Sequence, residues 1–145
     1  MGGAPVVETI RPGVQFTPDA AASFRRAESG WGRTIRANST YRDYWHQMSM
    51  HNNWNAYVAG RGPHPGHSRA IHPDYSIHCR GEALDSPDWV VSGFIAHMAR
   101  HGWVRTAAND PTEQHHFEYQ SWRDRHRNDP APAGGETITK EWDEM

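Results

Sequence analysis

The chain of 145 residues contains one cysteine, Cys79. A single cysteine cannot form an intramolecular disulfide, so the fold does not depend on an oxidising compartment. A closed structural zinc site usually takes four protein ligands, mostly sulfur, and one cysteine cannot supply it. If the chain binds a metal, we therefore expect an open site of imidazole and carboxylate ligands that keeps a position for water.

Long apolar runs and an excess of one charge are also lacking. No apolar run approaches the roughly 20 residues that span a bilayer, so we expect no membrane insertion. Lys plus Arg is 15 and Asp plus Glu is 17, a net charge of -2 that gives no reason to expect a nucleic-acid partner. The first residues lack the basic and apolar regions of a signal peptide. We expect synthesis in a cytoplasm and a monomeric protein.

The size and composition predict one domain followed by a short tail. A chain of this length buries about 68–70% of its unfolded surface, so it does not need disulfides or metal ions to fold. Residues 1–127 are expected to form this domain. From residue 128 the composition changes to a Pro/Ala/Gly linker and a short acidic tail, residues 128–145.

Local patterns predict an α+β fold, because short strands and helices occur without βαβ alternation. Residues 1–16 look like an irregular arm, and residues 60–75 form a Gly-, Pro- and His-rich loop. Helices are expected at 18–29 and 41–58, and a third from Pro87 that Gly102 closes. Strands are expected at 34–38, 76–85, 103–106 and 115–119.

Two short segments carry the chemistry, within a chain that has 11 histidines. His78 and Asp85 flank Gly81, whose conformational freedom can bring both side chains to one point. His116 would supply a third zinc ligand from a neighbouring strand, leaving a fourth position for water. Glu113 would take the proton from that water and deliver it to a leaving amine. The expected reaction class is metal-assisted hydrolysis of an amide.

These segments resemble a known family, the zinc D-Ala-D-Ala carboxypeptidases and VanY-type peptidases. The family pattern Ser-x-His-x-x-Gly-x-Ala-x-Asp, followed by Glu-x-x-His, is matched at every specified position. A further match to its Tyr-Arg-Ser-x-x-x-Gln segment lies upstream, and the resemblance covers about residues 17–122. The matching residues are Tyr41, Arg42, Gln47, Ser76, His78, Gly81, Ala83, Asp85, Glu113 and His116.

The resemblance implies a hedgehog/DD-peptidase-like fold, with a small antiparallel sheet, flanking helices and zinc in the cleft. It implies zinc ligation by His78, Asp85 and His116, and Glu113 as the catalytic base. It also implies that Arg42 binds the substrate carboxylate or the oxyanion, a role that suits its planar fork. Gln47 and Ser76 are expected to contact substrate.

The match is broken at three places. His115 stands where the family usually has tryptophan, so it is expected to line the substrate pocket, although it is also a rival imidazole. Asp43 replaces the serine of the upstream segment, and Cys79 follows His78 where no thiol is expected. Glu82 is a rival for the base, and Glu118 is expected to orient His116. The aromatic side chains between Tyr44 and Tyr57 are expected in the core.

The expected function is hydrolysis of peptidoglycan stem peptides. The small size, the lack of a signal peptide and the linker favour a phage endolysin that cuts L-Ala-D-Glu-type bonds and reaches the bacterial cell wall after release from the host cytoplasm. A D-Ala-D-Ala carboxypeptidase or dipeptidase of bacterial cell-wall metabolism is the alternative within this class. An alternative of another class is a non-catalytic, zinc-stabilised module that binds cell walls or belongs to a virion.

Overall fold

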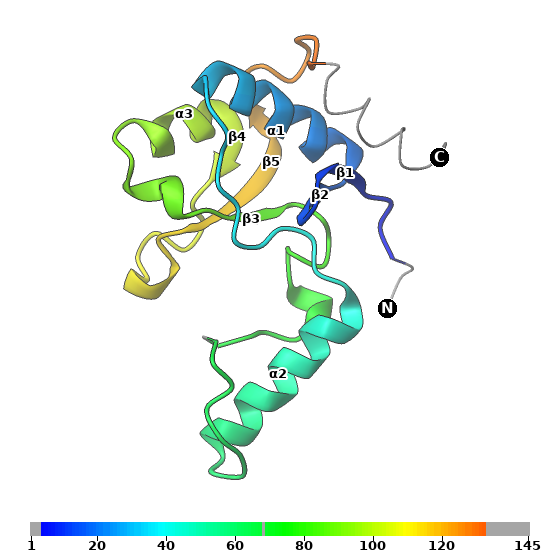
Figure 1. The fold of residues 1–145 in the computed structure, drawn as a ribbon, viewed down its shortest axis with the longest axis vertical. Coiled ribbons are helices and arrows are strands. Elements are labelled where there is room, and N and C mark those ends of the chain that lie inside the picture. Colours follow the sequence, from blue (N-terminus) through cyan, green and yellow to red (C-terminus); the bar gives the residue numbers. More distant parts are fainter. Residues whose placement is uncertain (1–3, 68, 133–145) are drawn as a thin grey trace.

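A computed structural model of the protein describes residues 4–67 and 69–132 (Figure 1). It has the predicted α+β architecture, with two antiparallel sheets and three α-helices within this part of the chain. None of the helices described is long and apolar enough to cross a membrane. The elements in chain order are β1 (Glu8–Arg11), β2 (Val14–Phe16), α1 (Pro18–Trp31), α2 (Tyr44–Val58), η1 (Pro73–Tyr75), β3 (Ala83–Asp85), η2 (Pro87–Val90), α3 (Phe94–Arg100), β4 (His101–Val104), η3 (Pro111–Glu113) and β5 (His116–Asp124), where η marks a 3-10 helix.

The larger sheet has the strand order β3-β5-β4, so β5 lies in the middle and pairs antiparallel with both neighbours. In its register with β3, Asp85 lies opposite His116 and Ala83 lies opposite Glu118. Three side chains that carry charge or a metal-binding nitrogen are therefore brought together by strand pairing. This register places two of the predicted zinc ligands, Asp85 and His116, opposite each other.

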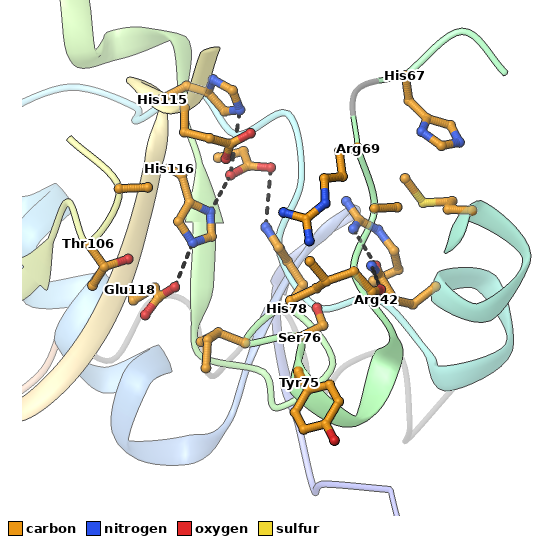
Figure 2. A pocket seen from close by; sticks show the side chains of 18 of the residues that line it. Arg42, His67, Arg69, Tyr75, Ser76, His78, Thr106, His115, His116 and Glu118 are labelled. Carbon is orange, nitrogen blue, oxygen red and sulfur yellow. Dashed lines mark hydrogen bonds and ion pairs between the residues drawn. The ribbon is translucent and has the colours of Figure 1, made fainter. Parts of the chain in front are cut away.

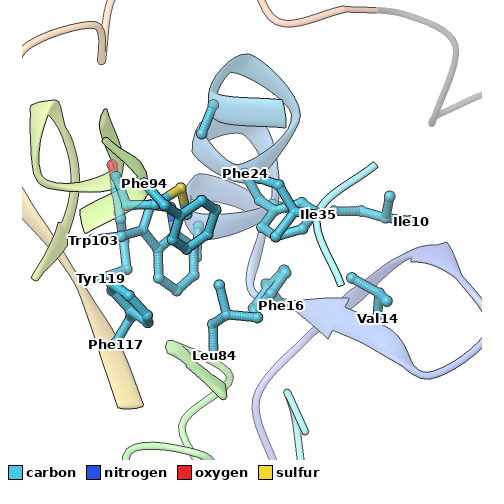
Figure 3. Packing of buried hydrophobic residues seen from close by; sticks show 14 residues of the cluster. Ile10, Val14, Phe16, Phe24, Ile35, Leu84, Phe94, Trp103, Phe117 and Tyr119 are labelled. Carbon is cyan, nitrogen blue, oxygen red and sulfur yellow. The ribbon is translucent and has the colours of Figure 1, made fainter. Parts of the chain in front are cut away.

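Aromatic side chains join the small hairpin, helix α1 and the larger sheet into one core (Figure 3). Phe16 of β2 lies 5.1 Å from Phe24 of α1 and 5.0 Å from Trp103 of β4, measured between ring centroids. All three side chains are fully buried. Aromatic pairs in such tilted and edge-to-face arrangements add about 0.5–1.5 kcal/mol each beyond the area that they bury.

Helix α1 follows the prediction closely, with Ala21, Phe24 and Ala27 fully buried on one face. It continues two residues beyond the predicted end and stops at Gly32, which has the left-handed φ of 85° expected of a C-terminal glycine.

Two predictions for the first forty residues are wrong. Residues 8–16 form a β-hairpin instead of an irregular arm, because Pro12 and Gly13 make a tight turn between two alternating segments. Residues 34–38 do not form a strand. Only Ser39, just beyond them, makes an isolated bridge to Asp85. The alternation at 34–38 arises because Ile35 enters the core.

The region from Pro87 to Gly102 differs from the single predicted helix. It divides into η2 and α3, because Gly93 takes a φ of 85° at the N-cap of α3. Gly102 lies inside β4 at a register shift and does not close a helix. A side chain there would place its Cβ 2.9 Å from the carbonyl oxygen of Gln120, so this close backbone approach requires glycine. The strand predicted for 76–85 is confined to β3, because turns occupy most of its first half.

Helix α2 and the loop that follows it project from the body formed by α1, α3 and the sheet (Figure 1). The prediction that the α2 aromatics belong to the core is wrong. Gln47 is the one buried residue of the helix, and Trp45 is 72% exposed. The physical reason is the position of the helix, which contacts mainly η1 and its own return loop.

The predicted boundary at residue 127 stays a prediction. The carbonyl oxygen of Asp129 accepts a hydrogen bond of 3.0 Å from Arg26 of α1, so the chain still contacts the body there. Most of the predicted linker and tail, residues 133–145, lies outside the described residues.

Candidate metal centre

Three side chains that were predicted as zinc ligands converge at one point: His78, Asp85 and His116 (Figure 2). Each offers a ligand atom, and these atoms lie within 4.8 Å of one another. The two carboxylate oxygens of Asp85 are divided between the imidazoles. One lies 3.2 Å from Nε2 of His78 and the other lies 3.0 Å from Nδ1 of His116.

The ring of His78 is oriented by the backbone. Its Nδ1 lies 2.7 Å from the carbonyl oxygen of Thr40, which can only accept, so Nδ1 carries the proton and donates. In the neutral ring the lone pair is then on Nε2, which faces Asp85. Such a contact fixes both the tautomer and the direction of a metal-binding histidine.

Thr40 is itself held by the unpredicted hairpin. Its hydroxyl donates to the carbonyl oxygen of Gly13 and accepts from the backbone N–H of Gln15, each at 3.0 Å. The N–H of Tyr41 donates to the carbonyl oxygen of Gln15 at 3.2 Å. The hairpin therefore supports the carbonyl group that orients His78.

His116 is oriented by a carboxylate, as the sequence led us to expect. Its Nε2 lies 2.8 Å from Oε2 of Glu118, on the same face of β5 two residues later. Because this nitrogen donates to Glu118, Nδ1 is the atom that faces Asp85 and the space between the three side chains. A carboxylate behind the ring also makes the imidazole a better ligand.

The charges of Asp85, His116 and Glu118 shift one another's pKa values. Burial alone would lower the pKa of His116, but the hydrogen bonds and negative charges of Asp85 and Glu118 raise it to about 9. Burial likewise favours protonated Asp85, yet its bonds to His116 and His78 hold its pKa well below the usual range. The pKa of Glu118 is lowered for the same reason. The negative charges of Asp85 and Glu118 therefore favour a proton on His116 at neutral pH.

Two imidazoles and one carboxylate form a donor set that suits zinc, with a position to spare. The carboxylates of Asp85 and Glu118 attract positive charge to the space between the rings, and the three donor atoms lie close enough to share one ion. The residues present therefore fit a divalent metal ion.

Gly81 closes the turn between His78 and β3. Its φ is +76°, and its N–H donates to the carbonyl oxygen of His78 at 3.1 Å. A Cβ at this position would lie 3.0 Å from the methyl carbon of Thr17. Both the left-handed conformation and the close approach require glycine here.

The three side chains line a cavity of about 470 Å³ (Figure 2). The remaining predicted site residues lie on its walls. Glu113 comes from the end of η3 and is half-buried, and within the described part of the chain its carboxylate has no hydrogen-bond partner. Ser76 is buried and His115 is 35% exposed at the side chain. All the predicted site residues line this one cavity: Arg42, Gln47, Ser76, His78, Asp85, Glu113, His115 and His116.

Arg42 and Gln47 are bonded to each other. One terminal nitrogen of Arg42 donates to Oε1 of Gln47 at 2.7 Å, and the other donates to the hydroxyl of Ser39. The amide nitrogen of Gln47 donates to the carbonyl oxygen of Ile71 at 2.8 Å. Both ends of the Gln47 amide are therefore occupied, so this residue links Arg42 to the loop at Ile71.

His115 and Cys79 lie outside the group of three. Nε2 of His115 is 3.9 Å from Oδ1 of Asp85, and its ligand atoms do not fall within the group. Cys79 lines a different cavity, where its thiol approaches the carbonyl oxygen of Asp43. Burial raises the pKa of this thiol, which disfavours the thiolate that binds metals.

Arg69 also lines the cavity, and sequence reasoning did not select it. It lies in the irregular loop between α2 and η1, where no periodicity indicates which side chains face inward. Thr40 was missed as well, because it acts through its backbone carbonyl. The one available signal was its place immediately before the matched Tyr41 and Arg42.

Searches against family models and curated sequences find no match. Solved structures do match. A variant of VanY, a vancomycin-resistance D,D-pentapeptidase in complex with Zn(II), is 17% identical with a TM-score of 0.55, over 79% of this chain and 78% of that one. The chain has the VanY-type zinc peptidase fold.

Two further structures have the same TM-score of 0.55. The D,D-dipeptidase VanXYg, in complex with a D-Ala-D-Ala phosphinate analogue, is 18% identical over 78% of this chain. The chain spans about half of that protein, 55% of its length. The LD-carboxypeptidase LdcB, solved to explain peptidoglycan recognition, is 16% identical over 96% of this chain and 72% of that one. The fold expected from the motif resemblance is therefore confirmed, and the endolysin subgroup stays a prediction.

Proposed function

We propose that the protein is a zinc-dependent peptidase that hydrolyses an amide bond in the stem peptides of peptidoglycan. The observation that carries this proposal is the convergence of His78, Asp85 and His116 in a cavity that also contains the carboxylate of Glu113. Among residues 4–67 and 69–132 this carboxylate has no hydrogen-bond partner. The shared fold supports it, because the solved structures with this fold are described as peptidases of this class.

Each residue has a role that follows from its position. His78, Asp85 and His116 hold the metal, and Thr40 and Glu118 keep the two rings in place. When bound, zinc supplies a Lewis acid that polarises the scissile carbonyl group and lowers the pKa of water. Glu113 takes a proton from the attacking water and delivers it to the leaving nitrogen. Arg42 presents a fixed guanidinium to the substrate.

The test of the base is Glu113→Gln, which removes the carboxylate and keeps the size of the side chain. We expect unchanged zinc content and a loss of hydrolysis of about 10²- to 10⁴-fold, the usual contribution of a positioned base. Glu82→Gln is the matched control, because Glu82 is also half-buried but does not line the cavity. Full activity in the Glu113 variant would refute the proposed mechanism. No hydrolysis by purified, zinc-loaded wild type would instead favour the non-catalytic binding module.

The ligand set has its own test. His78→Ala is expected to lose bound zinc, measured by metal analysis of the purified protein, and His115→Ala is expected to retain it. The opposite result would show that the wrong imidazole has been assigned.

We propose further, from the sequence, that the peptidase is a phage endolysin that cuts L-Ala-D-Glu-type bonds after release from the host cytoplasm. Cleavage within the stem detaches cross-linked chains, so the turbidity of a cell-wall suspension should fall. A D-Ala-D-Ala carboxypeptidase or dipeptidase trims free ends and leaves cross-links intact. Release of D-alanine without a fall in turbidity would favour this second function, which fits the fold as well.

A further inference from the structure

The loop between β4 and β5, residues 105–115, forms the wall of the cavity that contains the proposed base (yellow in Figure 1). Apart from the single turn of η3, the loop has no helix or strand of its own. Its shape must therefore depend on bonds other than those of regular secondary structure. The side chains that it places on the cavity wall include Asp110, Thr112, Glu113 and His115.

The carboxylate of Glu113 is positioned only through the loop that carries it. It has no hydrogen-bond partner among residues 4–67 and 69–132, whereas the backbone N–H of Glu113 donates to the carbonyl oxygen of Asp110 at 3.0 Å. A base must lie within hydrogen-bond reach of the proton that it removes. The place of Glu113 beside the metal centre therefore depends on how firmly the loop is held.

Gln114, the next residue, bonds to the loop through both ends of its side-chain amide. Its Oε1 accepts from Arg105 at 2.6 Å, where the loop leaves β4. Its Nε2 donates to the carbonyl oxygen of Ala108 at 2.8 Å and to that of Asp110 at 2.9 Å. One side chain thus joins the beginning, the middle and the end of the loop.

The end of the loop is bonded to the sheet. The carbonyl oxygen of His115 accepts a hydrogen bond of 2.9 Å from the backbone N–H of Ser86, just after β3. His116 then begins β5 opposite Asp85. Gln114 therefore connects the loop to the part of the sheet that holds two of the proposed zinc ligands.

We propose that Gln114 is a positioning residue, which holds the loop and thereby sets the place of Glu113 beside the metal centre. The inference rests on the proposed peptidase function and deepens it. A misplacement of about 1 Å at a catalytic group can lower a rate by about 10²-fold. Loss of the amide should therefore lower kcat while the zinc ligands and the fold are kept.

The test is Gln114→Met, which keeps the approximate length of the side chain and removes the three bonds. Gln120→Met is the matched control, because Gln120 is another half-buried glutamine, placed in β5 beyond the loop. Both changes are also made in the Glu113→Gln background. Hydrolysis of a soluble stem peptide, zinc content and unfolding midpoint are measured for every protein.

We expect Gln114→Met to lower kcat by about 10- to 100-fold and to change KM by less than about twofold, with zinc content kept. In the Glu113→Gln background the same change should lower the rate by less than about twofold, because the base is already absent. Gln120→Met should leave kcat unchanged in both backgrounds. An equal loss in both backgrounds, no loss in the wild-type background, or a loss that follows lost zinc or a lost fold, would refute the positioning role.

Failure of the proposed function gives a different pattern. If zinc-loaded wild type hydrolyses no stem peptide, the peptidase proposal fails. The effect of Gln114 on the loop is then measured by NMR order parameters of the backbone amides within residues 106–113. We expect values of about 0.85 in wild type and Gln120→Met, and below about 0.6 in Gln114→Met. Equal values in all three proteins would show that Gln114 does not hold the loop.

Discussion

Metal binding at the centre should release close to one proton per ion at pH 7. The pKa of His116 is raised to about 9 by Asp85 and Glu118, so about 99% of the metal-free protein is protonated there at pH 7. A metal ion needs the lone pair of Nδ1, the nitrogen that faces Asp85. The ion must therefore displace a proton that the two carboxylates hold.

The size of this effect follows from the pKa. A proton bound about two units above the working pH opposes metal binding by about 2.7 kcal/mol, at about 1.36 kcal/mol per unit. The apparent affinity for zinc should rise about tenfold from pH 7 to pH 8 and level off above pH 9. The charged form of His116 also stabilises the metal-free fold. This stabilisation is complete below about pH 6.5 and is lost as the pH rises through about 9.

Titration calorimetry in two buffers with different heats of ionisation measures the protons released. Near pH 8 the Glu118→Gln variant should release fewer protons than wild type, because the loss of that charge lowers the pKa of His116. Equal heats in the two buffers for wild type at pH 7 would refute the proposed protonation of the centre.

Two glycines and two aromatic residues give further predictions, each measured by urea denaturation. Gly81→Ala should lower the free energy of unfolding by at least about 1 kcal/mol more than Gly66→Ala. Both positions have a left-handed φ, which costs about 1–2 kcal/mol, but only at Gly81 does a Cβ meet other atoms within 4 Å. Phe24→Ala should cost about 3–5 kcal/mol, because its ring is fully buried between Phe16 and the sheet. Trp122→Ala, at a side chain that is 76% exposed, should change stability by no more than about 0.5 kcal/mol.

The ligand set was the part of the site that the sequence predicted most fully. His78 and Asp85 are separated by a turn that only glycine can make, and this spacing is visible in the sequence. Strand pairing then places His116 opposite Asp85. The turn between His78 and Asp85 is visible in their spacing, whereas the choice of His116 among the 11 histidines was supported by the resemblance to the peptidase family, and the register that brings it to Asp85 came from the structure.

The residues that orient the zinc ligands were less predictable. The hairpin of β1 and β2 was missed, although Pro12 and Gly13 separate two alternating segments and give a recognisable turn signal. Its effect on His78 passes through the hydroxyl and the carbonyl group of Thr40. A contact made by a backbone carbonyl does not depend on the type of residue, so the one signal for it was the place of Thr40 immediately before the matched Tyr41 and Arg42.

The wall formed by α2 and its return loop could not be predicted for another reason. Apolar side chains of a helix normally indicate a buried face, but this helix projects from the body and leaves Trp45 exposed. The loop next to Arg69 is bonded to α2 through Gln47 and His51, which contact the carbonyl groups of Ile71 and Ala70. Such bonds depend on the path of the loop, which has no periodic pattern.

Mass spectrometry of purified peptidoglycan after digestion tests the central claim most directly, because the new termini identify the bond that is cut. We predict one set of new termini in the stem peptide with zinc-loaded wild type, and none with the Glu113→Gln variant or after removal of zinc. New termini outside the stem peptide, or the same termini from the Glu113 variant, would contradict the assignment of this protein as a zinc peptidase of the cell wall.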